Sequence, residues 1–387
     1  MSAPTTPQVG NERGVSTLEL FFDLVFVFGI TQVTALLSED HSALGFVKGL
    51  LLLALLWWAW VGYAWLGTTV ALDDGRIRFA VFTAMAGVLI MAIGMPEWYS
   101  DQPGGLDGLI ATPVIVAGAY VVVRLANMAI YLRAAGGDRE LIRAVGRLSI
   151  SVAVAGLLVI TGAVIGGTVQ IVLVGVAVLL DLAGGLLGRG AGWVVNPGHF
   201  AERHGLIVII ALGESIVAIG VGASGAAVSL PIIVGAVVGV AVAGRLWMLY
   251  FDSNDEEMEH SLRMKTGAAQ AEQARDVYSY LHLVMVAGIV LIALGLKKVL
   301  FEAAEYGFGH ALPGYAAGAF GAGIVLYLLS RQLMRLRSGL PGDRLSWVAM
   351  VAALALGAAG MVLPAAVTAA VGFLVLHIAR AAVPAAR

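Results

Sequence analysis

Apolar residues fill twelve long stretches of this chain, and short polar segments separate these stretches. A helix needs about 20 apolar residues to cross the roughly 30 Å hydrocarbon core of a bilayer, and these stretches approach that length. We therefore predict an all-α fold, a polytopic transmembrane helical bundle of about 12 spans. The predicted spans are Val15 to Leu37, Leu44 to Leu66, Ile77 to Met95, Leu109 to Leu132, Leu148 to Ile165, Thr168 to Leu187, Gly205 to Val221, Ser229 to Tyr250, Tyr278 to Gly295, Tyr315 to Leu333, Leu345 to Val362 and Ala365 to Ala382.

The composition indicates the same class of protein. Of the 387 residues, 60% are hydrophobic and 12% are charged, a balance that soluble domains do not have. The chain has no cysteine, which excludes disulfides, thiolate metal sites and thiol catalysis. The formal net charge of −2 says little about partners, and we expect a lipid bilayer around the chain and no nucleic acid.

Lysine and arginine residues are distributed unequally between the predicted loops. With the N-terminus inside the cell, the cytoplasmic side receives 18 of them and the outside only three. Cytoplasmic loops retain Lys and Arg, so this asymmetry favours cytoplasmic N- and C-termini and an even number of spans. The first 14 residues are polar and show no signal peptide, so we interpret residues 1–14 as a cytoplasmic segment.

The second half of the chain repeats short motifs of the first half in the same order. Trp-x-x-Tyr occurs at residues 60–63 and again at 247–250, and Ala86 to Met95 recurs as Ala287 to Leu296. These echoes predict a duplicated six-helix unit. Because six is even, both repeats have the same orientation, and an axis along the membrane normal should relate them. Substrate or ion paths commonly lie between such halves.

We divide the chain on this basis into two repeats and their connections. The divisions are the N-terminal segment 1–14, the first repeat 15–187, a cytoplasmic linker 188–204, the second repeat 205–382 with a cytoplasmic insertion at 251–277, and a tail at 383–387.

The insertion begins with an acidic segment, Asp252 to Glu259, which superficially suggests calcium binding. The sixth position of an EF-hand loop should be glycine, and here it is Glu257. We therefore expect a solvated acidic loop and no metal site.

Helix 1 carries two ionisable residues inside an apolar stretch. Residues three or four apart on a helix share a face, so Glu19, Asp23, Thr31 and Thr34 can form one polar stripe. A carboxylate in hydrocarbon costs several kcal/mol, and a chain that keeps two of them in one helix is expected to use them. The alternative is that Glu19 lies at the inner membrane interface and Asp23 makes one interhelical salt bridge.

The seventh predicted span, Gly205 to Val221, contains Glu214, which we expect to lie nearest the bilayer midplane of all the carboxylates. The preceding Gly213 predicts close approach by a neighbouring helix, as in a packed interior. Glu214 is either a buried partner of an arginine or an ion or proton site, and the sequence does not separate these alternatives.

Further embedded charges occur on other helices. Most fall in the predicted cytoplasmic half, which suggests a water-filled vestibule open to the cytoplasm; alternatively, each charge pairs locally. Four embedded carboxylates against two arginines leave about two unpartnered negative charges, which favours cations or protons over anions. The candidates that join Glu19, Asp23 and Glu214 are Arg124, Asp181, Arg245 and His282, with Asp73 and Asp74 as secondary candidates in the loop after helix 2.

Enzyme chemistry finds weaker support. His199, Glu202 and His204 do not form an H-E-x-x-H motif, and two histidines five residues apart point in different directions on a helix. We expect these three residues, which are secondary site candidates, to line the inner interface. No cofactor-binding motif stands out, so we expect no cofactor.

Two long motifs resemble bacterial low temperature requirement A proteins. They are Glu-Leu-Phe-Phe-Asp-Leu-Val-Phe-Val-Phe from Glu19 and His-Phe-Ala-Glu-Arg-His-Gly-Leu-Ile-Val-Ile-Ile-Ala-Leu-Gly-Glu-Ser from His199 to Ser215. The resemblance covers nearly the whole chain and implies a multi-pass protein of the bacterial inner membrane. It implies no settled biochemical activity.

A second resemblance concerns helix 1. The segment Phe22-Asp23-x-Val25-Phe26 is similar to the Phe-Ser-Asp motif of a family of bacterial and lysosomal potassium channels, which also duplicate a six-helix unit. This chain has Phe22 at the position of the serine, and helix 7 has no second copy of the motif.

These observations favour a cation or proton channel or transporter. Glu19, Asp23 and Glu214 would face the ion, and Arg124 and Arg245 would tune these carboxylates. One alternative is an intramembrane enzyme or ligand-binding protein that uses His282 and Glu214. Another is a stress-response membrane scaffold, in which every embedded charge should be fully paired. The oligomeric state stays open, and a homo-oligomer is compatible with the sequence.

Overall fold

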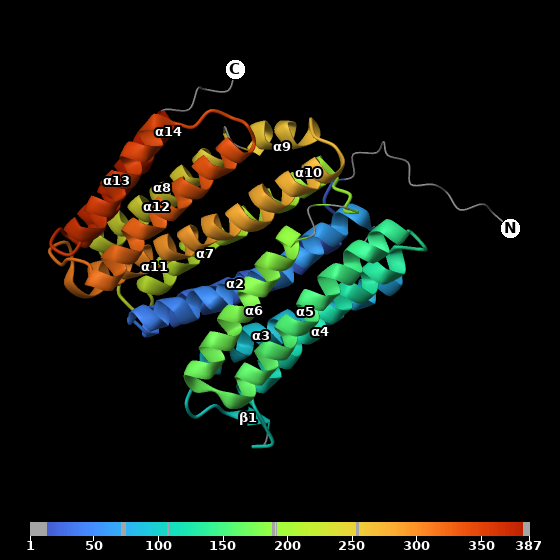
Figure 1. The fold of residues 1–387 in the computed structure, drawn as a ribbon. Helices are drawn as coiled ribbons and strands as arrows, with labels where there is room; N and C mark the ends of the chain where they lie inside the picture. The colour runs from blue at the N-terminus through green and yellow to red at the C-terminus, as the bar shows by residue number, and fades with distance from the viewer. Residues whose placement is uncertain are drawn as a thin grey trace.

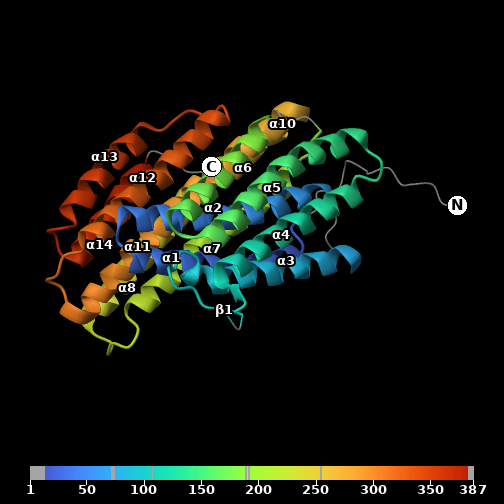
Figure 2. The ribbon, with the colours of Figure 1, turned by 60° about the horizontal axis from the view of Figure 1, so that its bottom comes forward.

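The chain folds into a bundle of long helices in a computed structural model, which describes residues 14–70, 75–106, 108–187, 190, 192–252 and 255–381. In Figures 1 and 2, α12, α13 and α14 lie at one side of the bundle and α3, α4 and α5 at the other, with α2 and α7 between them. The predicted all-α membrane fold is confirmed.

Among the described residues, six long helices form the first half of the chain. A short 3₁₀ turn, Met95–Glu97, extends α3, and a two-residue hairpin of β1 (Gly105–Leu106) and β2 (Ile110–Ala111) precedes α4. The helices are α1 (Thr17–Glu39), α2 (Ala43–Thr69), α3 (Gly75–Gly94), α4 (Thr112–Ala134), α5 (Arg139–Ile165) and α6 (Gly167–Leu187).

The described part of the second half also has six long helices, with two shorter helices and a π-helix inserted before α11. The long helices are α7 (Pro197–Gly222), α8 (Leu230–Phe251), α11 (His282–Tyr306), α12 (Gly314–Arg337), α13 (Arg344–Ala359) and α14 (Ala365–Ala381). The inserted elements are α9 (Asp255–Arg263), α10 (Gly267–Gln273) and the π-helix Ala274–Leu281.

Polar caps fix where several helices begin. Ser16 accepts a hydrogen bond from the Glu19 amide, and the Glu19 carboxylate accepts one from the Ser16 amide in return, which forms a capping box. Asp138 and Asp343 accept hydrogen bonds from the first free amides of α5 and α13. These caps satisfy amides that have no partner within the helix.

Across the described residues, ten helices are long and apolar enough to cross a membrane. The predicted ninth span is longer than expected, since Gly267–Tyr306 forms one continuous helical segment of 40 residues. The last two predicted spans are the shorter apolar helices α13 and α14. About 12 spans therefore remain consistent with the fold.

The helices of each half have the same order of neighbours. In the first half, α1 packs against α2 and α3, α3 against α4, α4 against α5, and α5 against α6, which returns to α2. In the second half, α7 packs against α8 and α11, α11 against α12, α12 against α13, and α13 against α14, which returns to α8. The predicted duplication stays a prediction, and this common order supports it.

A pair of glycines from the recurring motif occupies matching helix crossings. A Cβ on Gly87 of α3 would lie 2.6 Å from Val123 of α4, and one on Gly288 of α11 would lie 2.8 Å from the Gly323 carbonyl of α12. Both glycines therefore allow a close helix crossing. The two Trp-x-x-Tyr motifs match less well, since Trp60 is buried and Trp247 is exposed.

The acidic segment after α8 is helical, so the prediction of a solvated acidic loop is wrong in this respect. Residues 255–263 form α9, whose Glu257 makes an ion pair with Arg335 of α12 at 2.6 Å. Met258 and Leu262 on the same helix are fully buried. An apolar face and a specific ion pair thus hold this segment against the bundle.

The span order makes a prediction about sidedness. Seven candidate spans lie between the loop at Gly104 and the loop at Gly339, so we expect epitope tags at these two positions to report opposite sides of the membrane. A tag at Gly225, four candidate spans after Gly104, should report the same side as the Gly104 tag. Accessibility of the tags in intact cells and in inverted vesicles measures this, and a shared side for Gly104 and Gly339 would contradict the arrangement.

Candidate functional site

The main polar site lies between α1 and α7, the first helices of the two predicted repeats. The residue numbers of the contact pairs rise together on both helices, so α1 and α7 run parallel. We name this site the α1–α7 seam and define it by three contact pairs: Glu19 with His199, Asp23 with Arg203, and Thr31 with Glu214.

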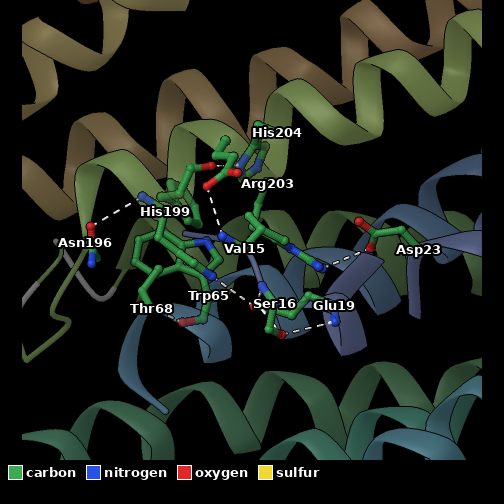
Figure 3. A network of polar contacts seen from close by, with 12 residues as sticks. Val15, Ser16, Glu19, Asp23, Trp65, Thr68, Asn196, His199, Arg203 and His204 are labelled. Atoms are coloured by element: carbon green, nitrogen blue, oxygen red, sulfur yellow. Dashed lines mark hydrogen bonds and ion pairs between the residues drawn. The ribbon is translucent and has the colours of Figure 1, made fainter. Parts of the chain in front are cut away.

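The first level of the seam lies near the N-terminal ends of both helices. Glu19 Oε1 lies 3.0 Å from His199 Nε2, while Glu19 Oε2 accepts hydrogen bonds from the amide and hydroxyl of Ser16. Figure 3 shows Glu19 and Ser16 beside His199 at this end of the bundle. Both Glu19 and His199 are buried within the bundle, and their position at the inner interface stays a prediction.

The second level is a buried ion pair. Arg203 Nη2 donates to Asp23 Oδ1 at 3.0 Å (Figure 3). The indole nitrogen of Trp60 on α2 donates to the same oxygen at 2.8 Å. Asp23 Oδ2 and two nitrogens of Arg203, Nε and Nη1, are buried without hydrogen-bond partners. The ion pair therefore leaves part of its hydrogen-bonding capacity unused. Burying such atoms costs free energy that a purely structural contact does not recover.

Glu214 forms the third level, further along α7. Its residue is 1% exposed, and the hydroxyl of Thr31 donates to Glu214 Oε2 at 2.5 Å. Among the described residues, no Lys, Arg or His nitrogen lies within 4.0 Å of this carboxylate. The alternative in which Glu214 pairs with an arginine is therefore wrong for this part of the chain.

The flanking glycine does not have the role that we expected. A Cβ on Gly213 would meet no atom within 4 Å outside its own helix, so no neighbour approaches it closely. The burial of Glu214 follows instead from its position on the helix face that points toward α1.

An aromatic cluster surrounds two histidines beside the seam. The rings of His204 and His282 lie 5.2 Å apart, and Tyr278 stacks on His282. His282 contacts the Tyr250 hydroxyl through Nε2 at 2.9 Å and the Val277 carbonyl through Nδ1 at 2.9 Å. Both ring nitrogens of His282 thus have protein partners, whereas His204 Nε2 is buried without one.

The π-helix provides this arrangement. Its wider turn lets the ring of His282 reach the carbonyl five residues earlier, and it places Ser279 against α2. The Ser279 carbonyl accepts from Trp57 and its hydroxyl accepts from Trp65. The tryptophans of α2 therefore serve packing and hydrogen bonding inside the bundle.

Arg124 and Asp181 form a separate ion pair between α4 and α6. Arg124 Nη2 donates to Asp181 Oδ1 at 3.0 Å, and Arg124 Nη1 donates to the Trp58 carbonyl at 2.9 Å. The Tyr120 hydroxyl donates to the other oxygen of Asp181 at 3.0 Å. Arg124 is therefore the partner of Asp181, and no contact joins it to the seam carboxylates.

The remaining candidates lie apart from the seam or beyond its buried part. The Arg245 guanidinium lies over the ring of Phe373, 5.1 Å from its centroid. Glu202 is exposed and accepts a hydrogen bond from the Val15 amide at 3.0 Å. Asp73 and Asp74 lie outside the described residues. Within the described ranges, no three His, Asp or Glu side chains are grouped so that they could hold a metal ion.

Arg203 is the functional candidate that sequence reasoning missed. The predicted topology includes it in the 18 cytoplasmic lysines and arginines, since it precedes the span that starts at Gly205, yet its residue is 0% exposed. Counting it as embedded reduces the expected excess of negative charge from about two to about one. Its spacing of four from His199 could have indicated a shared helix face.

The fold and the seam define a multi-pass membrane protein with a buried polar interface between two helical halves. Residues 14–381 match the family model of the bacterial low temperature requirement A proteins, and the chain belongs to this family. It is 27% identical over 314 residues to an uncharacterized protein of Rhizobium meliloti (strain 1021), RA0937. The aligned region covers 76% of this chain and 73% of that protein. No solved structure matches the chain.

Proposed function

We propose that this protein moves protons or small cations across the membrane along the α1–α7 seam, with Glu214 as the group that binds the ion. The observation that carries the proposal is Glu214 itself, a buried carboxylate that accepts from Thr31, has Thr34 beside it and makes no ion pair within 4.0 Å among the described residues. The charge of Lys297 acts on it from beyond that distance. A carboxyl group at this depth is stable when it holds a proton or a mobile cation.

The other two levels of the seam fit a gate on the same path. Glu19 with His199 and Asp23 with Arg203 are close pairs of an acidic and a basic side chain at the end that the sequence predicts to be cytoplasmic. An arriving proton or cation would compete with His199 or Arg203 for these carboxylates. This arrangement favours protons, because a proton can pass between side chains without an open pore.

The two alternatives fit the geometry less well. A scaffold needs every embedded charge to be paired, and Glu214 does not meet that condition among the described residues. An enzyme that uses His282 needs a free ring nitrogen, and both nitrogens of His282 have protein partners.

A flux assay tests the proposal. We expect purified protein in liposomes to give proton uptake, reported by an internal pH-sensitive dye, when valinomycin and a K⁺ gradient set the membrane potential. The Glu214→Gln variant keeps the hydrogen bond from Thr31 but removes the titrating group, so its flux should fall by about tenfold or more. Separate arms with Na⁺ and K⁺ gradients distinguish cation from proton movement.

The matched control is Glu305→Gln, an exposed glutamate on α11 outside the seam. Its flux should equal that of the unmodified protein. Equal flux in the Glu214 and Glu305 variants, or no flux of H⁺, Na⁺ or K⁺ with the unmodified protein, would overturn the proposal.

A further inference from the structure

A cavity of about 100 Å³ lies away from the seam, between α2, α4, α5, α6 and the π-helix. None of the six seam residues lines it. One water molecule needs roughly 10–15 Å³ of such space, so the cavity can hold several waters or a small polar group. The exposed Arg147 of α5 also lines the cavity, which brings one of its walls to the molecular surface.

Three hydrogen-bonding groups on the cavity wall have no protein partner. They are the indole nitrogen of Trp58, the side-chain amide nitrogen of Asn127 and the hydroxyl of Tyr131, and all three residues are at least nine-tenths buried. Buried polar groups without partners are rare in folded proteins and require an explanation. All three can donate a hydrogen bond, so an acceptor is the missing partner.

The charged side chains on the same wall are mostly positive, as the binding of an anion requires. Arg124, Arg147 and Arg275 line the cavity, and Asp181 is the one acidic residue among its described lining residues. Asp181 is bound to Arg124, and Asp276, which binds Arg275, also binds Arg337. Among the described lining residues, three arginines face one aspartate, so the wall favours an anion over a small cation.

Aromatic rings enclose these groups. Trp193 packs against Trp65 with ring centroids 5.8 Å apart and against Tyr131 at 5.4 Å, while Trp58 packs against Tyr280 at 5.8 Å. Such walls keep water away from the donors and strengthen their interaction with a bound charge. We propose that this cavity binds an oxyanion of the phosphate class, which accepts hydrogen bonds from Trp58, Asn127 and Tyr131 and is held electrostatically by Arg275.

Binding of radiolabelled inorganic phosphate to the full chain, purified in a neutral detergent, tests the soluble source of this anion. Native mass spectrometry in the same detergent tests the lipid source, with phosphatidic acid compared against neutral phosphatidylcholine. Saturable binding of phosphate supports a soluble ligand, and retention of phosphatidic acid alone supports a lipid headgroup. Binding of neither anion would overturn the inference.

Two substitutions separate a binding role from a structural one. Asn127→Leu removes an unpartnered buried amide, so the affinity for the anion should fall about tenfold while the melting temperature without anion stays equal or rises. Arg275→Gln should also lower the affinity. The control Arg143→Gln changes an exposed arginine of α5 outside the cavity lining and should bind normally. Unchanged affinity in the Asn127 and Arg275 variants would contradict the assignment.

Discussion

Replacement of Arg203 by methionine is expected to lower the free energy of unfolding by about 3–5 kcal/mol. The substitution leaves the Asp23 carboxylate buried with the Trp60 indole as its one remaining hydrogen-bond donor among the described residues. Uncompensated charge in a low-dielectric interior is the physical cause of the loss. Denaturant unfolding in detergent micelles, followed by tryptophan fluorescence, measures the change.

The double variant Asp23→Leu, Arg203→Met provides the decisive comparison. Removal of both charges should restore most of the stability, apart from about 1–3 kcal/mol for the Trp60 N–H group that loses its acceptor. The exposed Arg143→Met is the control and should be nearly neutral. If Arg203→Met unfolds like the control, or if the double variant is no more stable than the single one, the pair does not carry this energy.

Hydrophobic patterning predicted the class of fold because bilayer thickness dictates span length. It located the long helices from α1 to α8, but α5 begins at Arg139 instead of Leu148 and α7 at Pro197 instead of Gly205. It did not predict the π-helix, since the residues 274–281 have no local feature that separates a π-turn from an α-turn. Nor did it predict the helical form of residues 255–263, where contacts with α12 outweigh the acidic composition.

The candidate site was predictable in part. Helical spacing was sufficient to place Glu19, Asp23 and Thr31 on one face of α1, and that face meets α7. The partners were not predictable from spacing, because Asp23 and Arg203 are 180 residues apart. Arg203 also lies near the start of a helix, where an arginine most often belongs to a cytoplasmic loop.

Glycines show the same limit of sequence reasoning. Gly213 and Gly288 both sit in apolar helices, yet a Cβ would meet nothing near Gly213 and would meet the α12 backbone near Gly288. Helix packing decides which of these glycines is needed, and the sequence around each one does not report it.

Substitution of Gly288 by alanine is the second change with a large expected effect. Its Cβ would lie 2.8 Å from both the Gly323 carbonyl oxygen and the Tyr327 amide nitrogen. These are backbone atoms of α12, so they can move away from the new Cβ only if the whole helix shifts. We expect a loss of about 1–3 kcal/mol in the free energy of unfolding, because overpacking forces α11 and α12 apart.

Alanine variants of two further glycines provide the comparison, and the melting temperature in micelles measures the loss for each variant. Gly87→Ala should cost less than Gly288→Ala, since its closest neighbour is a methyl group of the Val123 side chain at 2.6 Å. Gly244→Ala on α8 meets nothing within 4 Å and should be neutral or more stable by about 0.4–1 kcal/mol. Equal melting temperatures for the Gly288 and Gly244 variants would mean that α11 and α12 do not cross at the distance described. The order Gly288, Gly87, Gly244 would instead indicate that the two matching crossings differ in tightness, although both use a glycine at the same place in the recurring motif.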